Sequence, residues 1–207
     1  MSEIWAGSDE SGKGDYFGPL VVATFVCHKS EVGRLTEMGV KDSKKLTDIK
    51  LKSIAEALIK GFRGRFQYLA LMPVKYNELY QKFSVRKPGL NEMLAWMHSK
   101  VIDELYQREK FDYVLIDKFA NDGLIRYYLN KNSDLTNDMI KIETKAEVDT
   151  AVACASIIAR YLYLKNMDEL SEKFGFKLLK GASKQVQALR RAIPIDIQPQ
   201  LVKMHFK

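Results

Sequence analysis

The chain has 207 residues, enough for one domain with a well-formed hydrophobic core. Its 33 lysine and arginine residues exceed its 26 aspartate and glutamate residues, and the net charge of +7 favours a polyanionic partner such as nucleic acid. The N-terminus has no signal-peptide pattern and no apolar run is long enough to cross a bilayer. These features argue against secreted and membrane-spanning proteins and favour the cytoplasm.

Apolar alternation and enrichment in Val and Phe predict three strands in the first part of the chain, at residues 4–10, 20–28 and 65–72. A glycine-rich loop and the Gly18-Pro19 turn join the first two strands, which favours a hairpin. A helix is predicted over residues 48–59, with Thr47 as its N-cap. Cys27 and Cys154 lie in apolar stretches, so we expect two buried, reduced thiols.

Four further elements are predicted: a long amphipathic helix over residues 90–105, strands over 113–117 and 139–142, and a helix rich in small residues over 149–164. The apolar stripe of the long helix is expected to pack on a sheet, and its His98 is expected to be a packed or hydrogen-bonded residue rather than a base. We expect one α/β domain over residues 1–207, with a mixed β-sheet flanked by helices and a C-terminal helical segment from about residue 165.

The most informative motif is residues 7–15, where two adjacent carboxylates precede a lysine between two glycines. It matches the start of the nucleotide-binding P-loop, but Gly14 stands where that loop needs a hydroxyl for Mg²⁺. In a second interpretation, Asp9 and Glu10 hold hard divalent cations while the flexible backbone of residues 12–14 approaches a phosphodiester. A third interpretation is an acidic turn with solvated side chains.

Other acids are predicted near the same place. Asp117 ends a short apolar strand, where open α/β sheets often present functional side chains, and Glu147 begins the helix rich in small residues. If the first and fourth strands are neighbours, these two acids converge with Asp9 and Glu10. Such a carboxylate cluster is what a two-metal phosphodiesterase requires.

Seven segments, in family order, resemble ribonuclease HIII and, more broadly, the type 2 ribonucleases H. They are residues 9–19 (DESGKGDYFGP), 40–46 (VKDSKKL), 76–79 (YNEL), 91–98 (NEMLAWMH), 116–120 (IDKFA), 145–147 (KAE) and 155–160 (ASIIAR). Lys13 favours the HIII form, because HII enzymes usually have arginine at that place. The similarity spans roughly residues 4–190.

The resemblance implies a ribonuclease H-like fold and endonucleolytic hydrolysis of the RNA strand of RNA/DNA hybrids by a two-metal-ion mechanism. Two Mg²⁺ or Mn²⁺ ions would serve as cofactors, and the products would carry 5′-phosphate and 3′-hydroxyl ends. The implied catalytic and metal-binding residues are Asp9, Glu10, Asp117 and Glu147. Glu143 and Asp149 are alternatives to Glu147.

For contact with nucleic acid, the resemblance and the local chemistry point to Gly12, Lys13, Gly14, Ser43, Lys44, Lys45, Lys180 and Ser183. The glycine backbone is expected to sense the 2′-hydroxyl or the shape of the hybrid, and the lysines and serines to contact phosphates. The small residues around Ser183 precede a helix start, which attracts anions.

Ribonuclease HIII usually carries an additional N-terminal domain resembling TATA-binding protein. Here the motif begins within ten residues of Met1, so we expect that domain to be absent, in a truncated or a naturally short form. We expect a monomer. The main alternative function is a hybrid-binding module without turnover, and a metal-dependent DNA nuclease is a second. The Gly-Lys-Gly sequence of the HIII form favours cleavage of continuous hybrids over cleavage at a single ribonucleotide within DNA.

Overall fold

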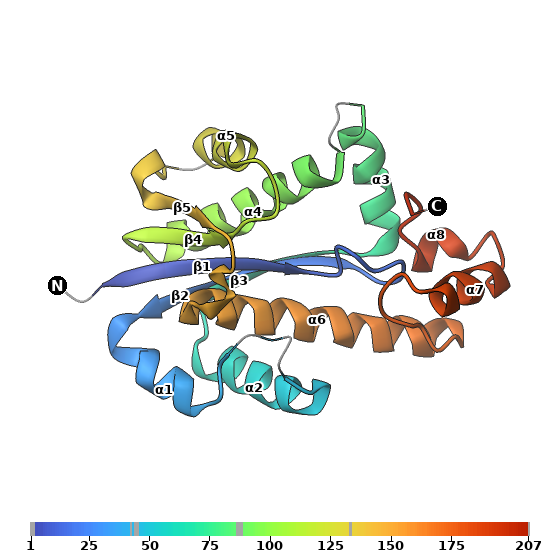
Figure 1. Ribbon diagram of the computed structural model, residues 1–207, viewed down its shortest axis with the longest axis horizontal. Coiled ribbons are helices and arrows are strands. Elements are labelled where there is room, and N and C mark those ends of the chain that lie inside the picture. The colour runs from blue at the N-terminus through green and yellow to red at the C-terminus, as the bar shows by residue number, and fades with distance from the viewer. Residues whose placement is uncertain (1–2, 42, 44–45, 86–88, 133, 207) are drawn as a thin grey trace.

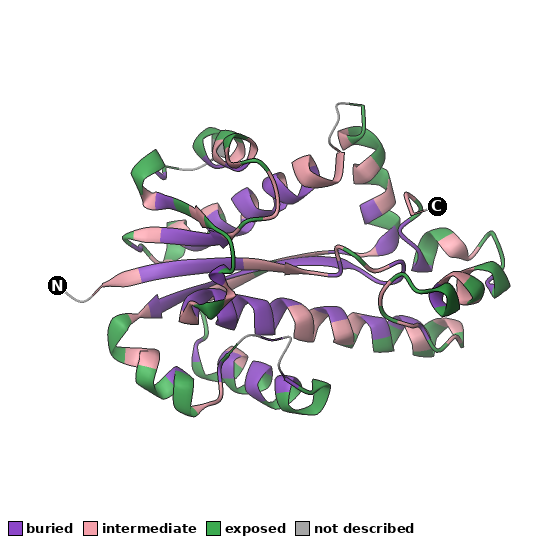
Figure 2. Cartoon of the chain, in the orientation of Figure 1, coloured by how far each residue is buried: buried purple, intermediate pink, exposed green. Residues whose placement is uncertain are grey.

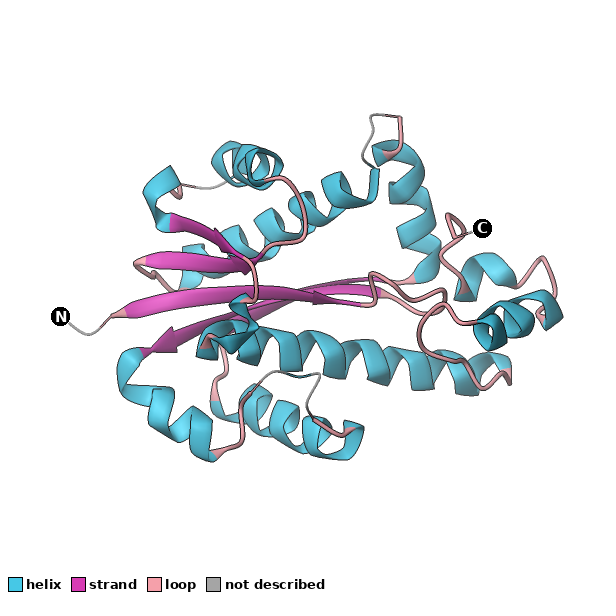
Figure 3. Ribbon diagram, viewed as in Figure 1, coloured by secondary structure: helices cyan, strands magenta, loops and turns pink. Residues whose placement is uncertain are grey.

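The computed structural model describes residues 3–41, 43, 46–85, 89–132 and 134–206 (Figure 1). Its centre is a five-stranded sheet with the strand order β3-β2-β1-β4-β5 (Figure 3). The strands are β1 (Ile4–Ser11), β2 (Leu20–His28), β3 (Phe66–Leu71), β4 (Tyr113–Asp117) and β5 (Ile140–Glu143). Since β2 is antiparallel to β1 and β3, whereas β4 is parallel to β1 and β5, the predicted mixed sheet is confirmed.

Helices cover both faces of this sheet. They are α1 (Val32–Glu37), α2 (Asp48–Gly61), α3 (Pro73–Phe83), α4 (Gly89–Arg108), α5 (Asp122–Asn132), α6 (Thr150–Phe174), α7 (Lys184–Ala192) and α8 (Gln198–Leu201), with short 3-10 turns η1 (Lys29–Glu31), η3 (Asn137–Met139) and η4 (Ala146–Val148). In Figure 1, α6, α1 and α2 lie on one side of the sheet, and α4 and α5 lie on the other. The sides of α4 and α6 that face the sheet are buried (Figure 2).

The elements predicted from local patterns are present, most of them with shifted ends. Thr47 caps α2 by accepting a hydrogen bond from the backbone N–H of Lys50. The last helix predicted in detail extends ten residues beyond position 164, because Met167 and Leu170 continue its buried face and Gly175 ends it in the left-handed conformation. Cys27 and Cys154 are free and buried, as expected. Among the described residues, no helix combines the length and apolar character needed to cross a bilayer.

The contact between α6 and β1 is unusually close. A Cβ atom at Gly7 would lie 2.1 Å from the backbone nitrogen of Val152, so only glycine permits this approach. The facing part of α6 is correspondingly rich in alanine. This packing places the middle of α6, including Ser156, next to the end of β1.

Candidate active site

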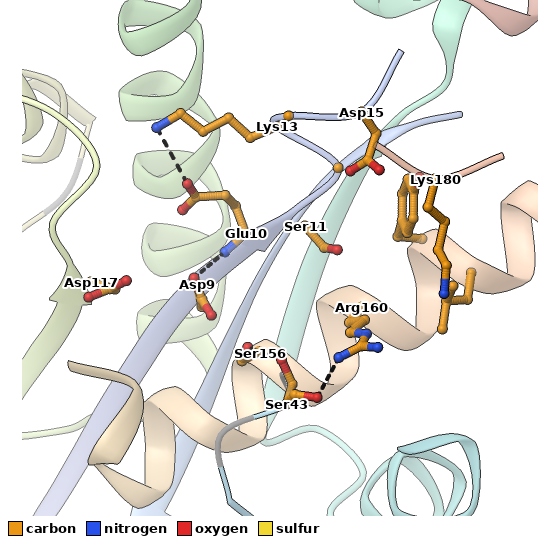
Figure 4. Close-up of a pocket in the computed structure, with 14 residues that line it drawn as sticks. Asp9, Glu10, Ser11, Lys13, Asp15, Ser43, Asp117, Ser156, Arg160 and Lys180 are labelled. Atoms are coloured by element: carbon orange, nitrogen blue, oxygen red, sulfur yellow. Dashed lines mark hydrogen bonds and ion pairs between the residues drawn. The ribbon is translucent and has the colours of Figure 1, made fainter. Parts of the chain in front are cut away.

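A pocket of about 440 Å³ opens at the ends of β1 and β4 (Figure 4). Three carboxylates, those of Asp9, Glu10 and Asp117, line its acidic side. Residues 12–15 form a second wall. A third wall carries Ser43, Ser156, Arg160 and Lys180. Acids and cations therefore share one cavity.

The strand register explains why the acids meet. Ser8 of β1 pairs with Ile116 of the parallel strand β4, so the next residues, Asp9 and Asp117, lie beside each other. Side chains alternate along a strand, and Asp9 follows Gly7 on the α6 face whereas Glu10 follows Ser8 on the α4 face. The adjacency of the first and fourth strands, on which the predicted convergence depended, is thus confirmed.

Asp9 is in an electrostatically unfavourable position. Its Oδ1 accepts a hydrogen bond from the Glu10 backbone N–H at 2.7 Å, and it is also hydrogen-bonded to Ser156. Burial, the charge of Glu10 and, to a smaller extent, that of Asp117 nevertheless raise the pKa of Asp9 to about 7. In the part of the chain that the structure describes, the groups that lower this pKa are hydrogen-bond donors, and none of them is a cation.

Asp117 anchors the turn that carries the fourth predicted acid. Its Oδ1 accepts a hydrogen bond from the backbone N–H of Ala146 at 3.1 Å, and Lys145 adopts a left-handed conformation with φ 61° to form the turn. Glu147 comes next in η4 and is partly exposed, but it is not among the residues that line the pocket. The structure therefore brings three of the four predicted acids together and places the fourth in the adjacent turn.

The two alternatives to Glu147 have different surroundings. Asp149 is the N-cap of α6: its carboxylate accepts hydrogen bonds from the backbone N–H groups of Ala151 and Val152 and from the indole of Trp5. Glu143 is exposed at the end of β5 and lines a separate cavity together with Asp149. Asp149 thus has a structural function as a helix cap.

Glu10 lies between two nitrogen-bearing side chains. Its Oε1 is 3.7 Å from Nζ of Lys13, and its Oε2 is 3.3 Å from Nε2 of His98. Lys13 also donates to the carbonyl of Phe119, at 3.3 Å, and its ammonium lies 5.3 Å from the centre of the Phe119 ring. Figure 4 shows Lys13 reaching back toward Glu10. The expected packed or hydrogen-bonded state of His98 is confirmed.

The opposite wall contains hydroxyl and cationic groups. The hydroxyls of Ser43 and Ser156 are 2.8 Å apart, and Arg160 donates to the carbonyl of Ser43. Arg160 and Lys180 both bind the carboxylate of Asp48, at 2.9 and 2.8 Å. Sequence reasoning missed Arg160, although it lies four residues after Ser156 and hence on the same face of α6.

Not all predicted nucleic-acid contacts are placed in the pocket. Ser183 is the N-cap of α7, where its hydroxyl accepts from the Val186 backbone N–H at 3.4 Å, and it does not line the cavity. Lys44 and Lys45 lie outside the described residues. Lys180 and Ser43 do line the pocket.

The two glycines around Lys13 differ. Gly12 has φ +90°, and a Cβ atom there would lie 2.3 Å from the carbonyl oxygen of Pro19. Gly14 has no neighbour within 4 Å of such a Cβ and is exposed. The backbone conformation and packing therefore require glycine at position 12, whereas nothing in the fold requires glycine at position 14.

The loop is held from its C-terminal side by Lys203, which sequence reasoning did not single out. Its side chain is fully buried, and Nζ donates to the carbonyls of Asp15 and Phe17 at 2.9 and 3.1 Å. Burial lowers the pKa of Lys203 to about 7, although the charge of Asp15 opposes this shift. The residue lies 188 positions from Asp15, so only the fold reveals the contact.

Within the part of the chain that the structure describes, no three His, Cys, Asp or Glu side chains are arranged as a ready-made metal site. The donor chemistry of the pocket still fits a divalent cation, because Asp9, Glu10 and Asp117, like Asp15 on the adjoining wall, offer oxygen ligands of the kind that Mg²⁺ and Mn²⁺ take. Burial and the neighbouring charges that raise the pKa of Asp9 both disfavour its ionised form, which a bound cation would stabilise.

Comparison with known proteins gives consistent results. The family model described as Ribonuclease HII matches residues 6–207. Ribonuclease HIII from Bacillus mycoides (strain KBAB4) is 38% identical over 208 residues, covering 97% of this chain and 65% of that protein. Ribonuclease HIII from Lysinibacillus sphaericus (strain C3-41) is 37% identical, covering 97% and 66%. This chain thus spans slightly less than two thirds of the length of these curated relatives.

Solved structures have the same fold. Bst-RNase HIII in complex with Mn²⁺ superposes with a TM-score of 0.86 at 32% identity, covering 99% of this chain and 67% of that one. The PCNA:RNase HII complex from Archaeoglobus fulgidus contains a chain with a TM-score of 0.76 at 31% identity, covering 99% and 95%. Because the family model extends over nearly the whole sequence and the solved relatives reproduce its sheet and helices, the chain belongs to the ribonuclease HII family.

Proposed function

We propose that this chain is an endonuclease of the ribonuclease HIII type, which hydrolyses the RNA strand of RNA/DNA hybrids and leaves 5′-phosphate and 3′-hydroxyl ends. The observation that carries this proposal is the meeting of Asp9, Glu10 and Asp117 at the ends of two parallel strands. Burial and the charges of Glu10 and Asp117 raise the pKa of Asp9, so these three carboxylates are held together at a cost that a bound cation would offset. Family membership and similarity to ribonuclease HIII proteins support the same reaction.

Asp9, Glu10 and Asp117, with Glu147 from the turn next to Asp117, are the residues proposed to hold two Mg²⁺ or Mn²⁺ ions. Bound ions would neutralise charge on the scissile phosphate and lower the pKa of the attacking water. Asp9 and Asp117 come from adjacent strands with rigid backbones, so they supply the fixed part of the site. Glu10 and Glu147 reach the site with longer side chains.

The rest of the pocket is suited to a nucleic-acid strand. Gly14 leaves its backbone open to a sugar, which is where a 2′-hydroxyl distinguishes RNA from DNA. Arg160 and Lys180, which share the Asp48 carboxylate, lie on the wall opposite the acids, and Arg160 also donates to the carbonyl of Ser43. We assign these groups to phosphates of the hybrid, together with Lys44, Lys45 and Ser183 as predicted from the sequence.

The decisive experiment is cleavage of three end-labelled substrates: an RNA/DNA hybrid, a DNA duplex, and a DNA duplex with one ribonucleotide. Each is incubated with EDTA, Mg²⁺ or Mn²⁺. Metal-dependent cutting confined to the continuous RNA strand is expected. Binding without cutting would indicate a hybrid-binding module, cutting of the DNA duplex a DNA nuclease, and cutting at the single ribonucleotide an HII-type specificity.

The two glycines provide a matched pair of variants. Gly14→Ala adds a methyl group in open space, so we expect normal thermal stability but a raised KM for the hybrid, because the methyl group blocks backbone approach. Gly12→Ala must lose stability, since it is strained at φ +90° and meets the Pro19 carbonyl. Unchanged kinetics in Gly14→Ala would remove the glycine backbone from the proposed substrate contacts.

The proposed enzyme acts as a monomer in the cytoplasm. Light scattering at micromolar concentration is expected to give the mass of one chain for the protein alone, and the mass of one chain plus one hybrid when a short hybrid is bound. A stable dimer would contradict this part of the proposal.

A further inference from the structure

A chain of buried hydrogen bonds leads from the centre of the sheet to Glu10. Oγ1 of Thr24 donates to Oγ of Ser8 at 2.9 Å, and the Ser8 hydroxyl is 2.8 Å from Nδ1 of His98. The other ring nitrogen of His98, Nε2, is 3.3 Å from Oε2 of Glu10. Thr24, Ser8 and His98 are all fully buried, so no solvent satisfies their polar atoms.

The imidazole of His98 is held in one orientation. It projects from α4 and stacks on the ring of Phe119, with centres 4.7 Å apart and planes 14° from parallel. Phe119 also receives Lys13 at its carbonyl, and Lys13 contacts the other oxygen of Glu10. The carboxylate is therefore bounded by a fixed ring on its Oε2 side and by a flexible lysine on its Oε1 side.

The network assigns the tautomer of the ring. Ser8 already accepts a hydrogen bond from Thr24 and has a single hydroxyl proton to donate, which can go to Nδ1 of His98 or to the carbonyl of Ala23, 3.1 Å away. Donation to Nδ1 leaves the proton of a neutral imidazole on Nε2, which then donates to the Glu10 carboxylate. The opposite choice would direct a lone pair at that carboxylate, so the first arrangement is favoured.

We propose that His98 is a positioning residue: its Nε2–H holds Oε2 of Glu10 toward α4, so that Oε1 faces the pocket, where a divalent cation replaces the Lys13 ammonium. The inference rests on the proposed function, because it assumes that Glu10 is a metal ligand. A hydrogen bond to a metal-binding carboxylate fixes the orientation of that carboxylate and raises the affinity of the site for metal. An apolar ring would fill the same space but leave the carboxylate free to rotate.

Two variants of His98, each keeping a polar group near one ring nitrogen, distinguish a positioning role from a packing role. His98→Gln places an amide N–H₂ near the position of Nε2 and retains a donor for Glu10, whereas His98→Asn retains only the contact near Ser8. Mn²⁺ affinity of the free protein is measured by electron paramagnetic resonance, and kcat and KM with the hybrid are measured separately. Ser99→Ala, which removes a buried hydroxyl bonded to the Trp96 carbonyl on the same helix, is the control.

We expect His98→Asn to weaken Mn²⁺ binding about 10-fold to 100-fold and to lower kcat while KM for the hybrid stays constant. His98→Gln should recover affinity to within a few-fold, and Ser99→Ala should leave it unchanged. Equal losses in the Gln and Asn variants, or unchanged Mn²⁺ affinity in His98→Asn, would overturn the inference.

A measurement on the unaltered protein covers the case in which the variants fail to fold. Nitrogen-15 NMR of labelled histidine is expected to show the Nε2–H tautomer for His98, and Mg²⁺ should shift that nitrogen more than those of His28 and His205. A proton on Nδ1 alone would overturn the proposed hydrogen bond. If the unaltered protein neither binds Mn²⁺ nor cuts the hybrid, the proposed function fails; if it does both and His98→Asn does too, only the inference on His98 fails.

Discussion

Asp9 and Lys203 are two ionisable side chains whose pKa values are both displaced to about 7, from opposite directions and mainly by burial. Lys203 is enclosed, and the two N–H groups of its neutral amine match the two carbonyls that it contacts. Asp9 instead lines an open pocket beside two like charges. The hydrogen bonds of Lys203 are satisfied within the fold. Among the described residues, no cation lowers the pKa of Asp9.

The two groups should affect stability with opposite signs. The pKa of Asp9 is raised on folding, so the folded protein binds more protons than the unfolded chain between about pH 4 and 7, and stability falls as the pH rises through that window. The pKa of Lys203 is lowered on folding, so the unfolded chain binds more protons between about pH 7 and 10.5, and stability rises there. An ionisable group in a cleft whose charge is not balanced by its neighbours is a candidate functional residue. A buried group whose hydrogen bonds are all satisfied is explained by the fold.

The largest expected effect concerns activity. Asp9→Asn and Asp117→Asn should each lower the rate of hybrid cleavage about a thousandfold, because either change removes a proposed metal ligand worth several kcal/mol in the transition state. Initial rates in Mg²⁺ and Mn²⁺ check this. The matched control is Asp149→Asn, which keeps the ability to cap α6 and should leave the rate within a few-fold. A near-normal rate in Asp9→Asn or Asp117→Asn would contradict the assignment.

The second effect is stabilisation by metal. At pH 8, Mn²⁺ at 100 times its dissociation constant should stabilise the unaltered protein by about 2.7 kcal/mol, since it binds only the folded state. Thermal unfolding with and without Mn²⁺ measures this increment. Asp9→Asn should lose most of it, and Lys203→Met should retain it. An equal increment in Asp9→Asn would show that the ion binds elsewhere.

The third effect is a gain of stability in Asp9→Asn, the variant that is expected to lose activity. In EDTA at pH 8, Asp9→Asn should be more stable than the unaltered protein by about 2 kcal/mol, because the variant removes an unfavourable charge. The gain should shrink as the pH falls toward 4, because the aspartate of the folded protein is protonated below about pH 7. Urea denaturation at several pH values tests this. A destabilised Asp9→Asn at pH 8 would mean that the hydrogen bonds of the carboxylate outweigh its repulsion.

The smallest effect is the pH dependence of Lys203→Met. This variant leaves two carbonyls without donors at every pH, and it removes a cost of burying the amine that is greatest below about pH 7 and declines as the pH rises toward 10.5. Its destabilisation relative to the unaltered protein should therefore be greater at pH 9.5 than at pH 6, by roughly 1–2 kcal/mol. Urea midpoints at both pH values test the sign, and Lys165→Met on the exposed face of α6 should show no such difference. Equal destabilisation at both pH values would indicate that the pKa of Lys203 is not lowered in the fold.

Local patterns in the sequence were sufficient for most of the secondary structure. The strands over residues 20–28 and 113–117 have the bounds that alternation and apolar runs predict, since burial of a strand is recorded in its own residues. The end of α6 was misplaced because polar and charged residues dominate beyond residue 164 and weaken the apolar period there. Motif reasoning named Asp9, Glu10 and Asp117, whose chemistry is readable without coordinates.

The sequence by itself determined the α/β pattern, the acid pair on the first strand and the glycine loop that follows it. Only the tertiary structure decided that Asp117 lies beside Asp9, that His98 contacts Glu10, and that a lysine near the C-terminus supports the loop. These contacts join residues separated by 88 positions or more, and no local periodicity encodes which distant partner a side chain will meet. Strand order and helix packing make that choice, because they set which buried polar groups can satisfy one another.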